Sequence, residues 1–184
     1  MRAAAAGRVV LAALPAGEMS WSQWLLWEER RLLLACARPV ASSGEVHSAF
    51  VDAGGQLLTC GRDDAGWGVL GQGEGVQESA VPRAVAGLGS VRICTVAVGY
   101  HHTLACSDEG VAYSFGYGGQ GRLGHGDTVS QHTPRVVEAL QGVHISAVAA
   151  GLSQSLALSE AGEITARSTP LDVAKKASSA TATQ

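Results

Sequence analysis

A block of eleven residues occurs three times along this chain, at nearly constant spacing. It occupies residues 41–51, 96–106 and 148–158, and each copy has a glycine at its fourth position: Gly44, Gly99 and Gly151. By residue number, the first two glycines lie 55 residues apart and the last two lie 52 apart. A fixed period of this length limits the fold to repeat architectures, because each unit buries its core only by stacking on its neighbours.

The match between units extends beyond this block. The further matched positions are glycines or a proline: Gly55 with Gly110, Gly61 with Gly116, residues 68–73 with 121–126, and Pro82 with Pro134. The interval shortens from 55 to 53 and then 52 residues along the unit. The first unit is therefore expected to have the longer loops.

The hydrophobic pattern within a unit is that of β-strands. Larger side chains alternate with small ones at Val111, Tyr113 and Phe115, which is a period of two. Turn residues at 107–110 bound this stretch and predict a hairpin. We predict four short strands per unit, placed in the middle unit near residues 82–86, 93–98, 103–106 and 111–115. Four antiparallel strands in about fifty residues make one blade of a β-propeller.

Three segments of the middle unit, residues 99–104, 108–116 and 121–127, resemble the regulator of chromosome condensation repeat. They read Gly-Tyr-His-His-Thr-Leu, Asp-Glu-Gly-Val-Ala-Tyr-Ser-Phe-Gly and Gly-Arg-Leu-Gly-His-Gly-Asp. The resemblance covers residues 41 to about 165 and implies a propeller of about seven blades, of which this chain holds about two and a half. We therefore predict an all-β fold, a partial and incomplete β-propeller of four-stranded antiparallel blades, with an additional helix near the N-terminus.

Twelve residues form the repeat signature that we expect to shape the blades. They are Gly44, His47, Gly61, Gly99, His102, Gly110, Gly116, Gly121, Leu123, Gly124, Gly126 and Gly151. The chain departs from the family pattern at several positions. Phe115 stands where Trp is usual, Gly118 where Asn is common, Arg122 where Gln is common, and Gln154 where His is usual. Residues 166–168 lack the aromatic-Gly strand ending of the family pattern.

The recurring histidines are expected to have a structural role. His47 and His102 hold the same repeat position, which favours a hydrogen bond to a backbone carbonyl within each blade. Other potential metal ligands in this region are spread over separate segments: His101, His125, Asp127 and His132. Because a zinc site needs ligands that converge at short spacing, we predict no metal site.

Two further motifs resemble chemical sites but have simpler interpretations. Residues 116–121 fit GxGxxG, yet the following Arg-Leu-Gly-His-Gly does not predict the helix that a dinucleotide site requires. Asp63-Asp64 lies in the longer loop, where we expect a solvated loop tip rather than acid–base chemistry. We predict no catalytic residue and no cofactor.

The chain divides into three parts by composition: a leader at 1–40, repeats at 41–166 and an Ala/Ser/Thr-rich tail at 167–184 that is typical of disorder. Trp21, Trp24 and Trp27 lie on one side of a predicted helix that runs to about Ala37. Two interpretations of this helix remain open: a docking or membrane-surface helix, or a cover for an open blade edge.

Composition narrows the classes of partner and compartment. The formal net charge is −3 and no basic stripe is visible, which argues against nucleic-acid binding. No apolar run reaches the roughly 18 residues of a membrane span. The sequence contains no asparagine and hence no N-glycosylation site. We expect an intracellular protein, cytoplasmic or nuclear, while organelle targeting by the leader stays open.

These observations favour a non-catalytic protein–protein interaction module, belonging to a larger signalling or ubiquitin-ligase-associated protein, as the resemblance implies for some relatives. The alternative that the resemblance implies is guanine-nucleotide exchange on a Ran-like small GTPase. No inserted wedge is visible between the repeats, which favours the first function. Since repeat units need neighbours, we also expect weak stability, self-association through open blade edges, or additional repeats elsewhere in the protein.

Overall fold

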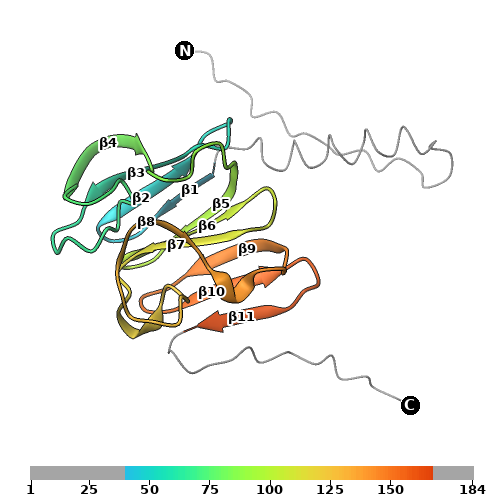
Figure 1. Ribbon diagram of the computed structural model, residues 1–184. Helices are drawn as coiled ribbons and strands as arrows, with labels where there is room; N and C mark the ends of the chain where they lie inside the picture. The colour runs from blue at the N-terminus through green and yellow to red at the C-terminus, as the bar shows by residue number, and fades with distance from the viewer. Residues whose placement is uncertain (1–39, 168–184) are drawn as a thin grey trace, which may run out of the picture.

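The computed structural model describes residues 40–167. The predicted tryptophan-containing helix, the leader and the tail from residue 168 onward lie outside these described residues. Within them, eleven strands form three antiparallel sheets that stack face to face (Figure 1). The sheets are four-, four- and three-stranded, and each is a meander in which neighbours along the chain are neighbours in the sheet.

Each sheet corresponds to one repeat, and we call the sheets blades 1, 2 and 3. Blade 1 contains β1 (Val40–Ser43), β2 (His47–Val51), β3 (Leu57–Arg62) and β4 (Glu78–Ala84). Blade 2 contains β5 (Ile93–Val98), β6 (His102–Ser107), β7 (Ala112–Gly116) and β8 (Gln131–Val136). Blade 3 contains β9 (Ile145–Ala150), β10 (Ser155–Ser159) and β11 (Ile164–Arg167). Short 3-10 helices lie at Gly119–Gly121 and Glu138–Leu140.

The predicted four-stranded antiparallel blades are confirmed, but one strand was assigned to the wrong blade. Residues 82–86 were expected to begin the middle blade, whereas Pro82 lies in β4, which pairs with β3 of blade 1. The reason is the long glycine-rich loop at 63–77, which returns the chain to the outer edge of the sheet it has just left. An outer strand also suits Pro82, because proline cannot donate a ladder hydrogen bond.

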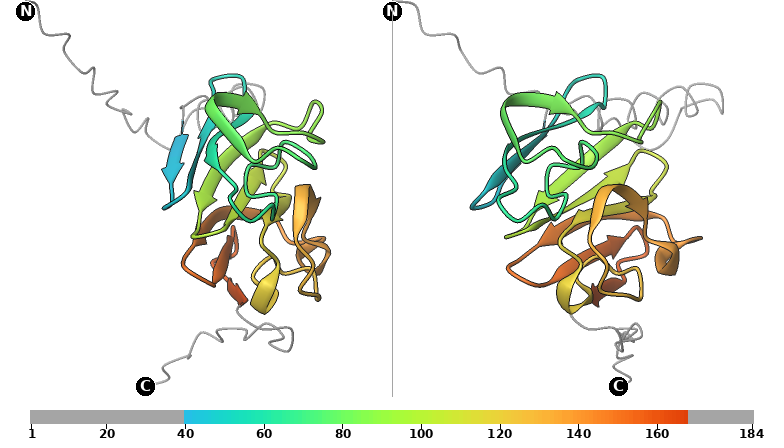
Figure 2. Two further views of the ribbon diagram at one scale, coloured as in Figure 1. Left: turned by 90° about the vertical axis from the view of Figure 1, so that its left-hand side faces the viewer. Right: turned by 60° about the vertical axis from the view of Figure 1, so that its left-hand side comes forward.

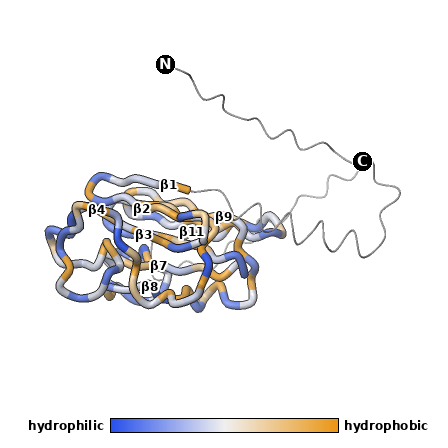
Figure 3. Tube along the Cα trace, turned by 90° about the horizontal axis from the view of Figure 1, so that it is seen from above, coloured by the Kyte–Doolittle hydropathy of each residue, from blue (hydrophilic) through white to orange (hydrophobic). Residues whose placement is uncertain are grey.

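The hydrophobic core lies between the blades, and alternate residues of each strand face opposite neighbours. One cluster joins blades 1 and 2 and includes Ala49, Val51, Ala105 and the fully buried Phe115. A smaller cluster joins blades 2 and 3 around Cys106, Ile145 and Ala157. Seen from above, hydrophilic residues gather in the loops at the sides of the stack (Figure 3). Each blade therefore has two apolar faces.

The connections alternate between the two ends of the blades (Figure 2). At one end lie the turns at 44–46, 99–101 and 151–154, and the long loops at 63–77 and 117–130. We call this the long-loop end. Shorter connections lie at the opposite end, at 52–56, 85–92, 108–111, 137–144 and 160–163. Eleven of the twelve signature residues lie at or beside the long-loop end, and Gly110 lies at the opposite end.

Candidate functional site

Three equivalent turns begin the central hairpin of each blade at the long-loop end. The backbone N–H of Gly44 donates to the carbonyl of His47 at 2.9 Å. The N–H of Gly99 donates to His102 at 2.8 Å, and that of Gly151 to Gln154 at 2.9 Å. The turn geometry is thus the same in all three blades.

These glycines let one blade approach the next closely. A Cβ atom on Gly44 would overlap the carbonyl oxygen of Gly99 in the following blade. A Cβ on Gly99 would lie 2.6 Å from the carbonyl oxygen of Gly151 and would also overlap the His102 ring. A Cβ on Gly151 would meet no atom of the described residues closer than 4.0 Å. Glycine is therefore required at the first two positions by contact between blades, and not at the third.

The recurring histidines bond to the next blade, not to a backbone carbonyl within their own, and that detail of the prediction was wrong. Nε2 of His47 lies 2.7 Å from the Thr103 hydroxyl, and Nε2 of His102 lies 3.1 Å from the Ser155 hydroxyl. Burial lowers the pKa of both rings to about 4, and for His102 the charge of Arg122 adds to this effect. Both imidazoles are therefore neutral at pH 7.

The remaining signature residues shape the long loops. Gly61 and Gly116 end β3 and β7 with φ of +125° and +104°, a conformation that side chains rarely adopt. Each long loop is tied to its blade by a hydroxyl: Thr59 donates to the Leu70 carbonyl at 2.5 Å, and Ser114 to the Leu123 carbonyl at 2.7 Å. The signature glycines of the second long loop, Gly121, Gly124 and Gly126, have positive φ, as does Gly110 at the opposite end.

Asp63 holds the first long loop from inside. It was predicted to lie in a solvated loop tip, but it is only 3% exposed. Its Oδ1 accepts the Trp67 N–H at 2.8 Å and its Oδ2 accepts the Gly68 N–H at 2.6 Å. The prediction holds for Asp64, which is exposed and pairs with Arg62 at 3.0 Å. The carboxylate of Asp63 thus orders the loop by capping its backbone N–H groups.

Four aromatic rings gather at the long-loop end, contributed by three loops from two blades. Trp67 lies 4.7 Å from the His101 ring and 4.3 Å from the Tyr117 ring, centroid to centroid. Tyr100 lies 4.0 Å from His101. We call Trp67, Tyr100, His101 and Tyr117 the aromatic cluster. All four residues are half-buried, so each of them is partly exposed at the long-loop end.

Arg122 connects the aromatic cluster to blade 3. Its guanidinium carbon lies 4.7 Å from the Tyr117 ring centroid, within cation–π distance. Its Nη1 donates to the Leu152 carbonyl and its Nε to the Gly119 carbonyl, both at 2.9 Å. Burial lowers the pKa of this guanidinium, and Arg122 as a whole residue is 4% exposed. Sequence reasoning noted Arg122 only as a departure from the family pattern.

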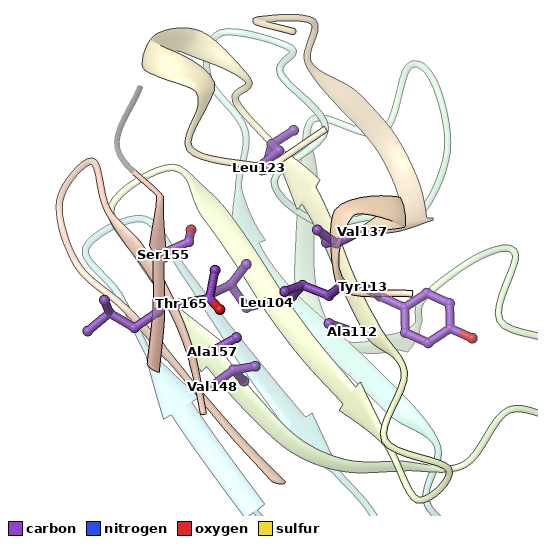
Figure 4. Close-up of a pocket in the computed structure, with 12 residues that line it drawn as sticks. Leu104, Ala112, Tyr113, Leu123, Val137, Val148, Ser155, Ala157 and Thr165 are labelled. Atoms are coloured by element: carbon purple, nitrogen blue, oxygen red, sulfur yellow. The ribbon is translucent and has the colours of Figure 1, made fainter. Parts of the chain in front are cut away.

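A second candidate site is a small cavity of about 30 Å³ between blades 2 and 3 (Figure 4). Its lining is almost entirely apolar and includes Leu104, Ala112, Leu123, Val137, Val148 and Thr165. Strand pairing explains why it exists. Phe115, opposite Thr103, fills the first interface, whereas the equivalent residue opposite Ser155 is Arg167. Likewise Tyr113 pairs with Ala105 in blade 2, whereas the equivalent pair in blade 3 is Thr165 with Ala157. Blade 3 thus has no aromatic residue at these two strand positions.

The polar groups that sequence analysis considered for metal chemistry have other partners here. His125 lies 3.0 Å from the Ser114 hydroxyl, His132 lies 2.9 Å from the Gly66 carbonyl, and Asp127 pairs with Arg135. Within residues 40–167, no group of three or more His, Cys, Asp or Glu side chains could hold a metal ion. No helix in that range is long and apolar enough to cross a membrane.

The family model of the regulator of chromosome condensation (RCC1) repeat matches residues 54–106 and 109–158. The chain belongs to the RCC1 repeat family. Human E3 ubiquitin-protein ligase HERC2 is 36% identical over 123 residues, which is 66% of this chain and 2% of HERC2. The Arabidopsis thaliana ultraviolet-B receptor UVR8 is 35% identical over 126 residues, 68% of this chain and 28% of UVR8. The RCC1 domain-containing protein RUG3, mitochondrial, of the same plant is 40% identical over 83 residues, 45% of this chain and 19% of RUG3.

Solved structures show the same fold for these RCC1 repeats. Human WBSCR16 superposes with a TM-score of 0.63 at 24% identity, over 71% of this chain and 33% of WBSCR16. Prp20p of Saccharomyces cerevisiae superposes with a TM-score of 0.56 at 25% identity, over 67% of this chain and 32% of Prp20p. The predicted RCC1-type propeller blades are confirmed. The chain spans about a third or less of each of these relatives, so it corresponds to a segment of their length.

Proposed function

We propose that this chain is a non-catalytic protein-recognition module that binds its partner through the long-loop end. The observation that carries the proposal is the aromatic cluster with Arg122 beneath it. Tryptophan, tyrosine and arginine are the residues most enriched at energetically important positions of protein interfaces. The twelve signature residues serve in this proposal as the frame that positions the loops.

The loops that carry the cluster are held in place before any partner arrives. The Asp63 carboxylate fixes the backbone at Trp67, and Arg122 fixes the loop after Tyr117 against the Leu152 carbonyl of blade 3. Preorganised loops lose less conformational entropy on binding, so more of the contact energy appears as affinity. A rigid scaffold that presents loops at one end is the usual arrangement for recognition in propellers.

The partner would be found by chemical crosslinking of the full chain in cell extract followed by mass spectrometry, and its affinity measured by calorimetry. Trp67→Ala is expected to weaken binding at least tenfold, since hot-spot truncations exceed about 2 kcal/mol. The matched control is Val143→Ala, which truncates an apolar residue 40% exposed at the opposite end. Unchanged affinity for Trp67→Ala, or equal weakening by Val143→Ala, contradicts binding at the long-loop end.

Nucleotide exchange on a small GTPase is the alternative function that family membership implies. The related Prp20p has binding properties to Gsp1p and histones. The matched segment is only 32% of Prp20p, so this property is not carried over. Release of a labelled guanine nucleotide from a Ran-like GTPase tests it directly. Acceleration well above the intrinsic release rate would replace the binding-module proposal.

For location, we propose the cytoplasm or nucleus, with organelle import as the competing outcome. The relative RUG3 is a mitochondrial protein. The first seventeen residues here contain Arg2 and Arg8 and no acidic residue, a composition shared with transit peptides. Fluorescence of residues 1–39 fused to a reporter protein in cells separates the two outcomes.

A further inference from the structure

One face of blade 3 is exposed, whereas the equivalent faces of blades 1 and 2 are covered by the blade that follows each of them. In β2, Ala49 and Val51 face blade 2 and are buried. The equivalent Leu156 and Leu158 of β10 alternate with the buried Ala157 and Ser159, and they are 41% and 37% exposed. Ile164 pairs with Leu158 across the sheet, lies on the same face, and is 56% exposed. Exposed apolar side chains gathered on one sheet face mark an interaction surface.

Two specific polar and steric contacts recur at each existing blade junction, besides the apolar packing. The first contact is between the histidine of one blade and a hydroxyl of the next blade. The hydroxyl belongs to the residue that follows the histidine's own repeat position, so His47 contacts Thr103 and His102 contacts Ser155. The second contact is between turn glycines. The carbonyl of Gly99 lies where a Cβ of Gly44 would be, and the carbonyl of Gly151 lies where a Cβ of Gly99 would be. A face that continues the series must therefore offer a hydroxyl, a glycine carbonyl and an apolar strand in register.

The opposite face of blade 1 offers all three features. Ser48 holds the repeat position of Thr103 and Ser155, and its hydroxyl is accessible beside Ser43 at 3.0 Å. Phe50 and its cross-strand neighbour Leu58 are half-buried on that face. The carbonyl of Gly44 stands where those of Gly99 and Gly151 stand in their own blades. The two outer faces of the three described blades are thus complementary to each other.

We propose that the free face of blade 3 binds the blade 1 face of a second copy of this chain, head to tail. In this contact the Gln154 amide hydrogen-bonds to the Ser48 hydroxyl of the second copy. Leu156 and Leu158 pack on Phe50, and the Gly44 carbonyl fills the open space at Gly151. The contact is heterologous, so copies add in series and form a ring only if the rotation closes. The residues that form it are distinct from the aromatic cluster of the long-loop end.

Gly151→Ala is the sharpest test, because the added methyl group would lie no closer than 4.0 Å to any atom of residues 40–167 in the same copy. Sedimentation velocity of the full chain over a concentration series up to about 100 μM would detect dissociation constants into the micromolar range. We expect the unchanged chain to associate and Gly151→Ala to weaken association at least tenfold, with an unaltered melting temperature when both chains are diluted until they are monomeric. A chain that stays monomeric throughout, or a variant that associates like the unchanged chain, overturns the proposal.

A mixing experiment tests the head-to-tail arrangement. Leu156→Glu blocks the blade 3 face and Phe50→Glu blocks the blade 1 face, so each variant alone is expected to be monomeric. A mixture of the two retains one intact face of each kind and should form a 1:1 dimer and nothing larger. Far-UV circular dichroism verifies that both variants fold. A Phe50→Glu variant that dimerises alone would mean that blade 3 pairs with itself, and a mixture that stays monomeric would mean that the two faces do not meet; either overturns the proposal.

Discussion

Replacing Phe115 by alanine should convert the tight first blade junction into one like the second. Phe115 is fully buried, and its ring packs against Gly71 so closely that a Cβ there would lie 2.6 Å from Cε2. Its strand, β7, is paired on both sides by β6 and β8, so the backbone cannot move inward to fill the space. Large-to-small changes at such sites cost about 3–5 kcal/mol, and the poor collapse here favours the upper half of that range.

The assay is urea unfolding of the full chain at pH 7.5, followed by circular dichroism. Since domains of this size are typically stable by about 5–15 kcal/mol, Phe115→Ala should remove a large fraction of the total. The control is Val81→Ala, which truncates a side chain that is 60% exposed on β4 and should change stability by less than about 0.5 kcal/mol. If Phe115→Ala lowers the free energy of unfolding by less than about 1 kcal/mol, the ring does not fill the space between blades 1 and 2.

Two further predictions concern buried polar groups. Because the pKa values of His47 and His102 are lowered from 6.5 to about 4, the unfolded chain binds more protons between these pH values; stability should therefore fall as pH drops from 6.5 to 4, by about 3 kcal/mol per histidine. Urea unfolding at pH 7 and 4.5 measures this loss of stability. His102→Gln, which introduces the residue found at position 154, should make the dependence of stability on pH shallower. An unchanged dependence would contradict the lowered pKa of His102. Asp63→Ala leaves the N–H groups of Trp67 and Gly68 unpaired and should lower the free energy of unfolding by about 1–3 kcal/mol in the same assay. The control, Asp64→Ala, changes the exposed neighbour and should have little effect. Equal losses for the two variants would contradict the role of Asp63 in holding the loop.

The blade architecture was predictable because its determinants are local and repeated. Gly44, Gly99 and Gly151 mark the same turn in three blades, and the alternation around Tyr113 marks a strand. The assignment of Pro82 to a blade failed for a physical reason. Hydrophobic periodicity identifies a strand but does not state which sheet it joins, and that choice is made by the path of the loop at 63–77.

The aromatic cluster was not predictable in the same way. Trp67, Tyr100 and Tyr117 come from three loops, and nothing in their spacing along the chain brings them together. Asp63 was misjudged because a carboxylate beside Asp64 in a long loop has the same sequence appearance whether it is solvated or caps backbone N–H groups. His47 and His102 hold equivalent positions in blades 1 and 2, as their spacing along the chain indicates. The hydrogen-bond partner of each ring lies in the next repeat, however, and a comparison within one unit does not reveal it.

These contacts make each blade depend on the blade that follows it. Blade 1 places Gly44 and His47 against blade 2, and blade 2 places Gly99 and His102 against blade 3. Arg122 adds a further bond in the same direction, from the long loop of blade 2 to the Leu152 carbonyl. Since nearest-neighbour contacts supply most of the stability of a repeat protein, blade 3, which has one described neighbour and no counterpart of Phe115, is the least stabilised of the three described blades. An occupant of the free face of blade 3 should therefore tighten that blade and, through Arg122, the Tyr117 side of the aromatic cluster, which would couple assembly to recognition at the long-loop end.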